Sequence, residues 1–228
     1  MRAGWMLALA AGLALAPRQG VKTIAVSSID LPRDFANLPS PRARFDSLIV
    51  SVLRGEGFTV VSAAASESIW VHLRDSMGGY YDTYTGKLVE AKWNAVHLGT
   101  LRELRARYGA EAWLHPDIEF VGAPFEGGKV KWHGVEQTSG APGGVGGFLF
   151  GTKTGSVPAL SLFTMVEDSA GKELYSGVGG IELAARIVGD RFVDVPRLAL
   201  LGDGGRNVAA VHLALDSLPA RLAGKTGP

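Results

Sequence analysis

Two histidines and two acidic residues near the middle of the chain are the strongest candidates for metal or acid–base chemistry. His115, Asp117 and Glu119 alternate along one segment, and His133 lies on the segment that follows it. Side chains at every second residue of a strand point to the same face. Imidazole and carboxylate groups gathered on one face are typical ligands of a transition metal. Alternation also places polar residues on the solvent-facing side of a sheet, so a solvated surface is the competing interpretation.

Two other short motifs resemble catalytic or phosphate-binding sequences. Ser169 and Lys172 have the spacing of a serine–lysine hydrolase, but Gly171 between them favours a hairpin turn over the helical turn which that chemistry requires. The segment 143–151 is rich in glycine, but it lacks the lysine and the strand-to-helix setting of a phosphate-binding loop. The sequence therefore identifies no catalytic residue, and we expect no cofactor.

The glycine-rich segment 138–155 is the most unusual part of the chain. A long insert between strands of a compact domain is often functional. Its centre holds the apolar triplet Phe148, Leu149 and Phe150, with no charged neighbour. The triplet either covers one end of the sheet or contacts a partner, since an exposed apolar patch usually marks a contact site. These three residues are the candidate partner-binding residues, and the expected partner is an envelope protein or a membrane surface.

The first half of the chain predicts strands that alternate with helices. A strand over 21–29, a helix capped by Ser40 and a short strand over 58–61 form a strand–helix–strand unit. The usual right-handed crossover makes its two strands parallel. Two more helices follow, and the second carries His97 four residues after Trp93. That spacing favours a packed, hydrogen-bonded histidine over a catalytic one.

The next segment follows period two and predicts an antiparallel hairpin. Its strands run over 112–121 and 129–137, and apolar residues alternate with polar residues along both. If the turn is centred near Glu126, His133 lies opposite Glu119 on the polar face.

A second hairpin and a closing helix complete the expected domain. Its strands run over 157–167 and 173–183, and Asp203 is placed to cap the helix. We therefore expect a single α/β domain over 17–223, with a disordered tail over 224–228. Its mixed sheet has about five or six strands, and about three or four helices flank it.

The composition excludes several classes of function. The 228 residues include 23 Lys and Arg against 22 Asp and Glu, for a formal net charge of +1. Such a balance gives no basic surface for a nucleic-acid backbone, so no nucleic-acid partner is expected. The chain has no cysteine, which excludes disulfides, thiolate metal sites and cysteine nucleophiles.

The first 16 residues have the features of a secretory signal peptide. Arg2 precedes the uncharged apolar run 4–16, which is shorter than the roughly 20 residues that span a bilayer. The run ends in a small-x-small pattern at Ala16 that a signal peptidase cleaves. Pro17 is unfavourable after a cut, so cleavage after Gly12 and an uncleaved anchor remain alternatives. We expect a periplasmic or secreted protein.

The order of these elements and several short sequences resemble a group of bacterial envelope modules. The sequences lie at 107–110, where a helix ends in RYGA, at the turn 168–173, and at 78–87 and 132–135. Over roughly 21–218 the chain resembles the curli-secretion (CsgG-type) and penicillin-binding-protein activator (LpoB-type) lipoproteins, although their lipid-anchor cysteine is missing. The resemblance implies a periplasmic accessory domain without enzymatic activity.

Two functions from different classes follow. The first is an exported cell-envelope accessory protein that binds a protein or an envelope component without catalysis. The alternative is a periplasmic metal-binding protein or hydrolase that uses the strand face with His115, Asp117, Glu119 and His133. A homo-oligomer is compatible with either.

Overall fold

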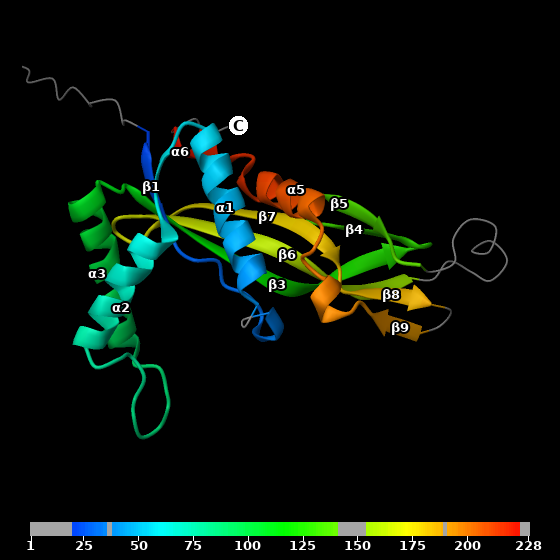
Figure 1. Ribbon diagram of the computed structural model, residues 1–228, viewed down its shortest axis with the longest axis horizontal. Coiled ribbons are helices and arrows are strands. Elements are labelled where there is room, and N and C mark those ends of the chain that lie inside the picture. The colour runs from blue at the N-terminus through cyan, green and yellow to red at the C-terminus, as the bar shows by residue number, and fades with distance from the viewer. Residues whose placement is uncertain (1–19, 36–37, 141–153, 189–190, 224–228) are drawn as a thin grey trace, which may run out of the picture.

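The computed structural model describes four stretches of the chain, residues 20–35, 38–140, 154–188 and 191–223 (Figure 1). The expected signal peptide over 1–16, the expected tail over 224–228 and the triplet Phe148, Leu149 and Phe150 lie outside the described residues. No helix within the four stretches is long and apolar enough to cross a membrane.

The chain alternates strands with helices and then runs through consecutive strands, as the sequence predicts. The strands are β1 (Thr23–Val26), β2 (Thr59–Val61), β3 (Ala112–Glu126), β4 (Lys129–Trp132), β5 (Val135–Thr138), β6 (Thr154–Asp168), β7 (Glu173–Leu183), β8 (Ala185–Val188) and β9 (Arg191–Asp194). The helices are α1 (Pro39–Gly55), α2 (Ala63–Ser76), α3 (Glu90–Tyr108), α5 (Gly204–Leu215) and the short α6 (Leu218–Leu222), and η1 (Arg33–Phe35) and η2 (Arg197–Ala199) are single 3-10 turns. The expected single mixed α/β domain is confirmed.

Seven strands form one mixed sheet with β3 at its centre. β6 runs antiparallel along the whole of one edge of β3, and β7 continues the sheet beyond β6. On the other edge, β1 pairs in parallel with the start of β3 and β4 pairs with its end. β2 extends the sheet beyond β1, again in parallel, which confirms the predicted strand–helix–strand unit. β8 and β9 form a separate two-stranded sheet.

The sheet has more strands than the expected five or six because the segment after the first turn divides in two. β4 and β5 pair with each other across His133 and Gly134, whose φ angles are 40° and 81°. Two central residues with positive φ are the requirement of a tight two-residue hairpin. The alternation over 129–137 predicted one strand because only one of these two turn residues is a glycine.

The first hairpin also has a different register from the predicted one. Phe125 pairs with Val130, and two glycines of positive φ form the turn just after Glu126. β4 then leaves the edge of β3, so His133 does not lie opposite Glu119. The predicted register was wrong because the turn is centred between Gly127 and Gly128, later in the sequence than Glu126.

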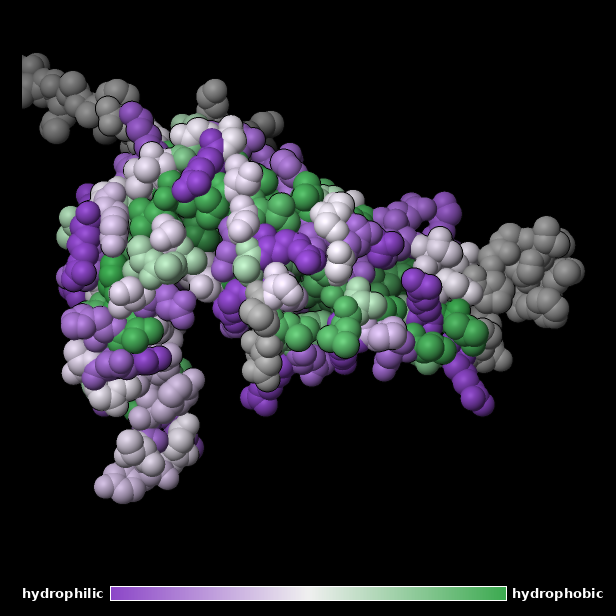
Figure 2. Space-filling model, in the orientation of Figure 1, coloured by the Kyte–Doolittle hydropathy of each residue, from purple (hydrophilic) through white to green (hydrophobic). Residues whose placement is uncertain are grey.

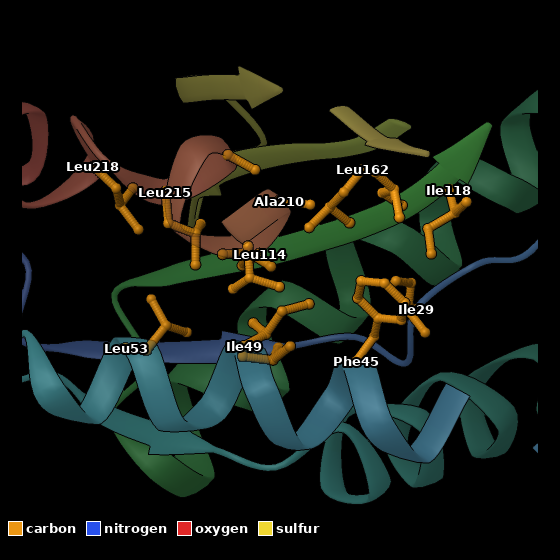
Figure 3. Close-up of a cluster of buried hydrophobic side chains, with 14 of the residues drawn as sticks. Ile29, Phe45, Ile49, Leu53, Leu114, Ile118, Leu162, Ala210, Leu215 and Leu218 are labelled. Carbon is orange, nitrogen blue, oxygen red and sulfur yellow. The ribbon is translucent and has the colours of Figure 1, made fainter. Parts of the chain in front are cut away.

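One face of the sheet is covered by α1 and α5, and it holds the largest apolar core. Phe45, Ile49 and Leu53 recur along α1 at helical spacing and point at the sheet, where they meet Leu114 and Leu162 (Figure 3). The side chains of all five are at most 1% exposed. The helix begins at Pro39 with Leu38 as its N-cap, so the cap lies two residues before the expected Ser40.

Close backbone contact joins α5 to this face. A Cβ atom on Gly179 of β7 would lie only 2.1 Å from the carbonyl oxygen of Ala210 on α5. The hydroxyl groups of Thr164 and Tyr175 both donate to the carbonyl oxygen of Ala214, at 3.0 and 2.8 Å. The absence of a side chain at Gly179 therefore lets α5 lie directly on the strand.

The opposite face is covered by α2 and α3, at the end of the sheet that holds β1 and β2 (Figure 1). Successive side chains of β1 point to opposite faces of the sheet. Ile24 and Val26 pack with α1, and Ala25 packs with α2 and α3. Trp113 and Leu104 belong to this second cluster. At β1, therefore, α1 covers one face of the sheet, and α2 and α3 cover the opposite face.

Candidate functional site

A cleft of about 610 Å³ opens where β1 ends. After β1 the chain passes through α1 to β2, which pairs with one edge of β1. It then passes through α2 and α3 to β3, which pairs with the other edge of β1. Crevices at the carboxyl ends of strands that diverge in this way are common ligand sites in α/β sheets. Arg42 on α1, Glu67 on α2, Trp93 on α3 and His115 on β3 are among its lining residues. Figure 2 shows the surface hollowed between the α2–α3 side and the rest of the molecule.

Three tryptophans and a histidine form one wall of the cleft. Trp70 of α2 meets Trp93 of α3 edge to face, with ring centroids 6.1 Å apart. The His97 ring is stacked between Trp93 and Trp113, at centroid distances of 4.8 and 5.6 Å. Trp113 is 3% exposed, whereas Trp70 and Trp93 are half-buried and line the cleft. This group is called the aromatic wall below.

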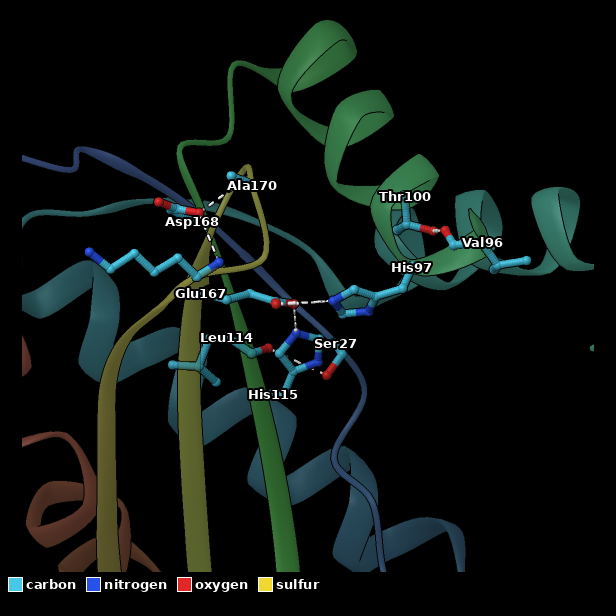
Figure 4. Close-up of polar contacts among 10 residues, drawn as sticks. Ser27, Val96, His97, Thr100, Leu114, His115, Glu167, Asp168 and Ala170 are labelled. Atoms are coloured by element: carbon cyan, nitrogen blue, oxygen red, sulfur yellow. Dashed lines mark hydrogen bonds and ion pairs between the residues drawn. The ribbon is translucent and has the colours of Figure 1, made fainter. Parts of the chain in front are cut away.

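A buried carboxylate lies behind the aromatic wall. Glu167 of β6 is 5% exposed in its side chain and lies between two histidines (Figure 4). Its Oε1 atom is 2.9 Å from Nε2 of His97 and 2.7 Å from Nε2 of His115. The β6–β7 pairing shifts register between Val166 and Glu167, where β7 holds one extra residue, Leu174.

The protonation of this cluster follows from its geometry. Burial by itself raises the pKa of Glu167, but hydrogen bonds from His115 and His97 outweigh burial and lower that pKa to about 2. Glu167 is therefore ionised at neutral pH and accepts both hydrogen bonds. Because an ionised carboxylate cannot donate, each histidine carries a proton on Nε2.

The pKa of Asp117, a carboxylate that lines the cleft, is shifted upward, whereas that of Glu167 is shifted downward. Burial raises the pKa of Asp117 to about 6, with further contributions from the hydrogen bond and charge of Glu119 and from the charge of Asp30. The backbone of Asp30 bonds β3 on both sides of Asp117, so the two carboxylates are held near each other. Asp117 is thus a lining group that exchanges a proton close to neutral pH.

Two of the four residues on the predicted polar face line the cleft. His115 and Asp117 line the cleft, and Glu119 lies beside Asp117. His133 lies in the β4–β5 turn, where its Nδ1 atom is 2.8 Å from the hydroxyl oxygen of Ser161, the residue that pairs with Glu119 across β3 and β6. Within the four described stretches no group of three or more metal-ligating side chains is arranged to hold a metal ion.

Ser161 beside His133, and Ser27 and Ser28 in the cleft, do not complete a nucleophilic site. Ser161 is 0% exposed and also accepts a hydrogen bond from the Trp132 indole N–H, so a substrate has no access to it. In the cleft, the hydroxyl of Ser27 donates to a backbone carbonyl at 3.4 Å and that of Ser28 donates to Glu67 at 3.2 Å.

The motif with Ser169 and Lys172 is a hairpin turn, as predicted. Oδ1 of Asp168 accepts from the backbone N–H of Ala170 at 2.8 Å and of Lys172 at 3.0 Å (Figure 4). Gly171 has a φ of 79°, which is the left-handed conformation that glycine adopts without strain.

No sequence pattern pointed to Glu167 or Trp70 as residues of this site. His97 is the packed, hydrogen-bonded histidine that its spacing after Trp93 predicted. Its partner Glu167 is 70 positions away, and no local pattern marks a glutamate at a strand end as buried. In the structure Glu167 lies opposite Trp113 in the β3–β6 register, a pairing that a single sequence does not reveal.

Comparison with models of known protein families gave no match for this sequence, and comparison with curated protein sequences gave none. Among solved structures, the chain is similar to lipoprotein GNA1162 from Neisseria meningitidis, with 17% sequence identity and a TM-score of 0.36. The alignment covers 79% of this chain and 90% of that chain. A similarity of this size assigns neither a family nor a function.

Proposed function

We propose that this protein is an exported cell-envelope accessory module that binds a ligand in the cleft beside β1 and does not catalyse a reaction. The observation that carries the proposal is the cleft itself, about 610 Å³ in volume and lined by Trp70, Trp93 and Trp113. Sites for small molecules have volumes of roughly 300–1,000 Å³, with mostly apolar walls and a few well-placed polar groups. The cleft has both features.

The state of the polar groups supports binding over catalysis. Glu167 is held ionised by two hydrogen bonds, so it is a poor proton donor. His97 and His115 both donate their Nε2 protons to it. Asp117 could exchange a proton, but general acid–base catalysis also needs a reacting group in position. The hydroxyls of Ser27 and Ser28 donate to other acceptors instead.

The location in the envelope is supported by the sequence. The apolar run 4–16 and the small-x-small end at Ala16 are typical of export through a signal peptide. The resemblance to CsgG-type and LpoB-type lipoproteins agrees with a periplasmic or secreted accessory role. The triplet Phe148, Leu149 and Phe150 is proposed as a separate contact for an envelope protein or membrane surface.

A pair of matched serine variants tests the cleft. Ser28 lines it, so Ser28→Trp places a large side chain inside. Ser47 is exposed on α1, and Ser47→Trp adds the same side chain outside the cleft. A ligand that binds the folded state raises the melting temperature. We expect a bacterial envelope extract to raise the melting temperatures of the wild type and Ser47→Trp, but not that of Ser28→Trp.

Two outcomes would overturn the cleft as the binding site. One is a wild-type melting temperature that the extract leaves unchanged. The other is an equal rise in all three proteins, which would place the ligand elsewhere.

Export has its own test. Expression of the whole chain in a bacterium should give a periplasmic protein whose intact mass corresponds to loss of residues 1–16. Recovery of the full-length chain from the cytoplasm would contradict an envelope role, because no ligand of the envelope would then be accessible.

A further inference from the structure

The charges that line the cleft are unbalanced. Asp30, Glu67 and Asp117 contribute three carboxylates, and Arg42 is the one guanidinium among the described lining residues. The ionised Glu167 lies behind the aromatic wall and adds to the negative side. A concave surface lined by one sign of charge concentrates ions of the opposite sign. The charge of the cleft therefore favours a cation.

The raised pKa of Asp117 agrees with a negatively charged cleft. Its pKa is raised by burial and then by the neighbouring carboxylates of Glu119 and Asp30. Negative charges that repel each other in a partly buried site are relieved when a positive group binds among them. A bound cation would therefore stabilise the ionised form of Asp117.

The rest of the lining favours an organic cation over a metal ion. Within the described part of the chain, no three carboxylate or imidazole groups are arranged to hold a metal. The half-buried indoles of Trp70 and Trp93 line the same cleft as the carboxylates. Tryptophan faces attract ammonium groups through the cation–π interaction, most strongly when the cation is desolvated.

One buried polar atom in this wall is without a partner. The side chain of Trp113 is 3% exposed, and its indole N–H makes no hydrogen bond to any described residue. Buried donors are nearly always satisfied, so an unpaired one points to an acceptor that comes from outside the chain. Trp113 is also a lining residue of the cleft. A ligand with a hydroxyl or ether oxygen could supply that acceptor.

We infer that the cleft binds an organic ammonium ion that carries an oxygen acceptor, the chemistry shared by amino alcohols and amino sugars. The carboxylates of Asp30, Glu67 and Asp117 surround the ammonium group, the indoles of Trp70 and Trp93 contact its alkyl substituents, and the oxygen faces Trp113. This inference names the ligand class of the cleft and so rests on the proposed function.

Calorimetric titration with choline and with glucosamine tests the inference. The neutral isostere 3,3-dimethylbutan-1-ol matches choline in shape but has no charge, and glucose plays the same part for glucosamine. We expect at least one of the two amines to bind the wild type, and its neutral counterpart to bind about tenfold more weakly or not at all.

Two glutamate variants separate the cleft from the rest of the surface. Glu67→Gln removes one lining charge, whereas Glu56→Gln makes the same change at an exposed position just after α1. We expect Glu67→Gln to weaken amine binding about tenfold and Glu56→Gln to leave it unchanged.

The inference is overturned if a neutral compound binds as tightly as its amine, or if neither amine binds. The proposed function is judged separately by the envelope extract and the two serine variants. If the extract still stabilises the wild type but not Ser28→Trp, the cleft binds a ligand of another class and only the present inference fails.

Discussion

Nε2 of His97, in the middle of α3, lies 2.9 Å from Oε1 of Glu167, near the end of β6. The same oxygen lies 2.7 Å from Nε2 of His115 on β3. One buried carboxylate thus joins a helix to the two central strands of the sheet. Because α3 also carries Trp93, this contact sets the position of the aromatic wall and of the cleft beside it.

Replacing Glu167 with Gln should destabilise the fold by about 2–4 kcal/mol at pH 7, since two charge-assisted hydrogen bonds to a buried group are lost. The folded-state pKa of about 2 lies below the ordinary 4.5, so the stabilisation is full above pH 4.5 and is lost as the pH falls toward 2. Urea unfolding of the wild type and Glu167→Gln at pH 7 and pH 3 measures both effects.

The control for this prediction is Glu173→Gln, which makes the same change at an exposed position on β7. It should alter the free energy of unfolding by less than about 0.5 kcal/mol. Equal effects of the two substitutions would show that the Glu167 contacts contribute nothing specific.

Asp117 should give the opposite pH dependence. Its folded-state pKa of about 6 lies above the ordinary 3.8, so the folded protein holds this proton more tightly than the unfolded chain. Stability from this group is therefore present below pH 3.8 and is lost as the pH rises through 6. Asp117→Asn cannot ionise, so it should melt at a higher temperature than the wild type at pH 7 and at a similar one near pH 4. The exposed Asp75→Asn is the control, and an identical response of both variants would contradict the prediction.

A methyl group added at Gly179 should strongly destabilise the fold, because α5 lies directly on β7 at this residue. In Gly179→Ala, the new Cβ would lie 2.1 Å from the carbonyl oxygen of Ala210, and backbone on both sides resists displacement. We expect a loss of about 3 kcal/mol or more in the free energy of unfolding. Gly55→Ala, at the end of α1 with no atom near its Cβ, should instead stabilise by about 0.4–1 kcal/mol. A similar effect at both positions would contradict the close packing described for α5.

Local patterns predicted the parts of the fold that local chemistry determines. β7 runs from Glu173 to Leu183 as the turn sequence 168–172 indicates, and Asp203 caps α5 through a 3.1 Å hydrogen bond from the backbone N–H of Arg206. The β4–β5 turn was missed because His133 adopts a positive φ, which is uncommon for any residue other than glycine.

The site depended on pairings that a single sequence does not reveal. The predicted polar face contained His115 and Asp117, which do line the cleft, but alternation alone could not tell which other elements cover them. Register along β3 and β6 brings Glu167 opposite Trp113, and α3 then supplies His97. Such long-range contacts follow from the packing of whole elements.

The ligand inference predicts that choline binding weakens in mild acid. Asp117 loses its charge as the pH falls below about 6, and at one pH unit lower only about a tenth of it is ionised. The affinity of the wild type should therefore fall about tenfold between pH 7 and pH 5. Other charged or titratable groups face the same space, namely Asp30, Arg42, Glu67, His97, His115 and Glu119.

A variant separates Asp117 from these neighbours. Asp117→Asn has no charge to lose at this position, so its affinity for choline at pH 7 should already be close to that of the wild type at pH 5. Acidification should then weaken the variant much less than it weakens the wild type, and any remaining slope belongs to the neighbouring groups. Calorimetric titrations of both proteins at the two pH values make the comparison. Equal slopes would mean that Asp117 is not a contact of the ammonium group, because removing its charge would then have left the proton linkage of binding unchanged.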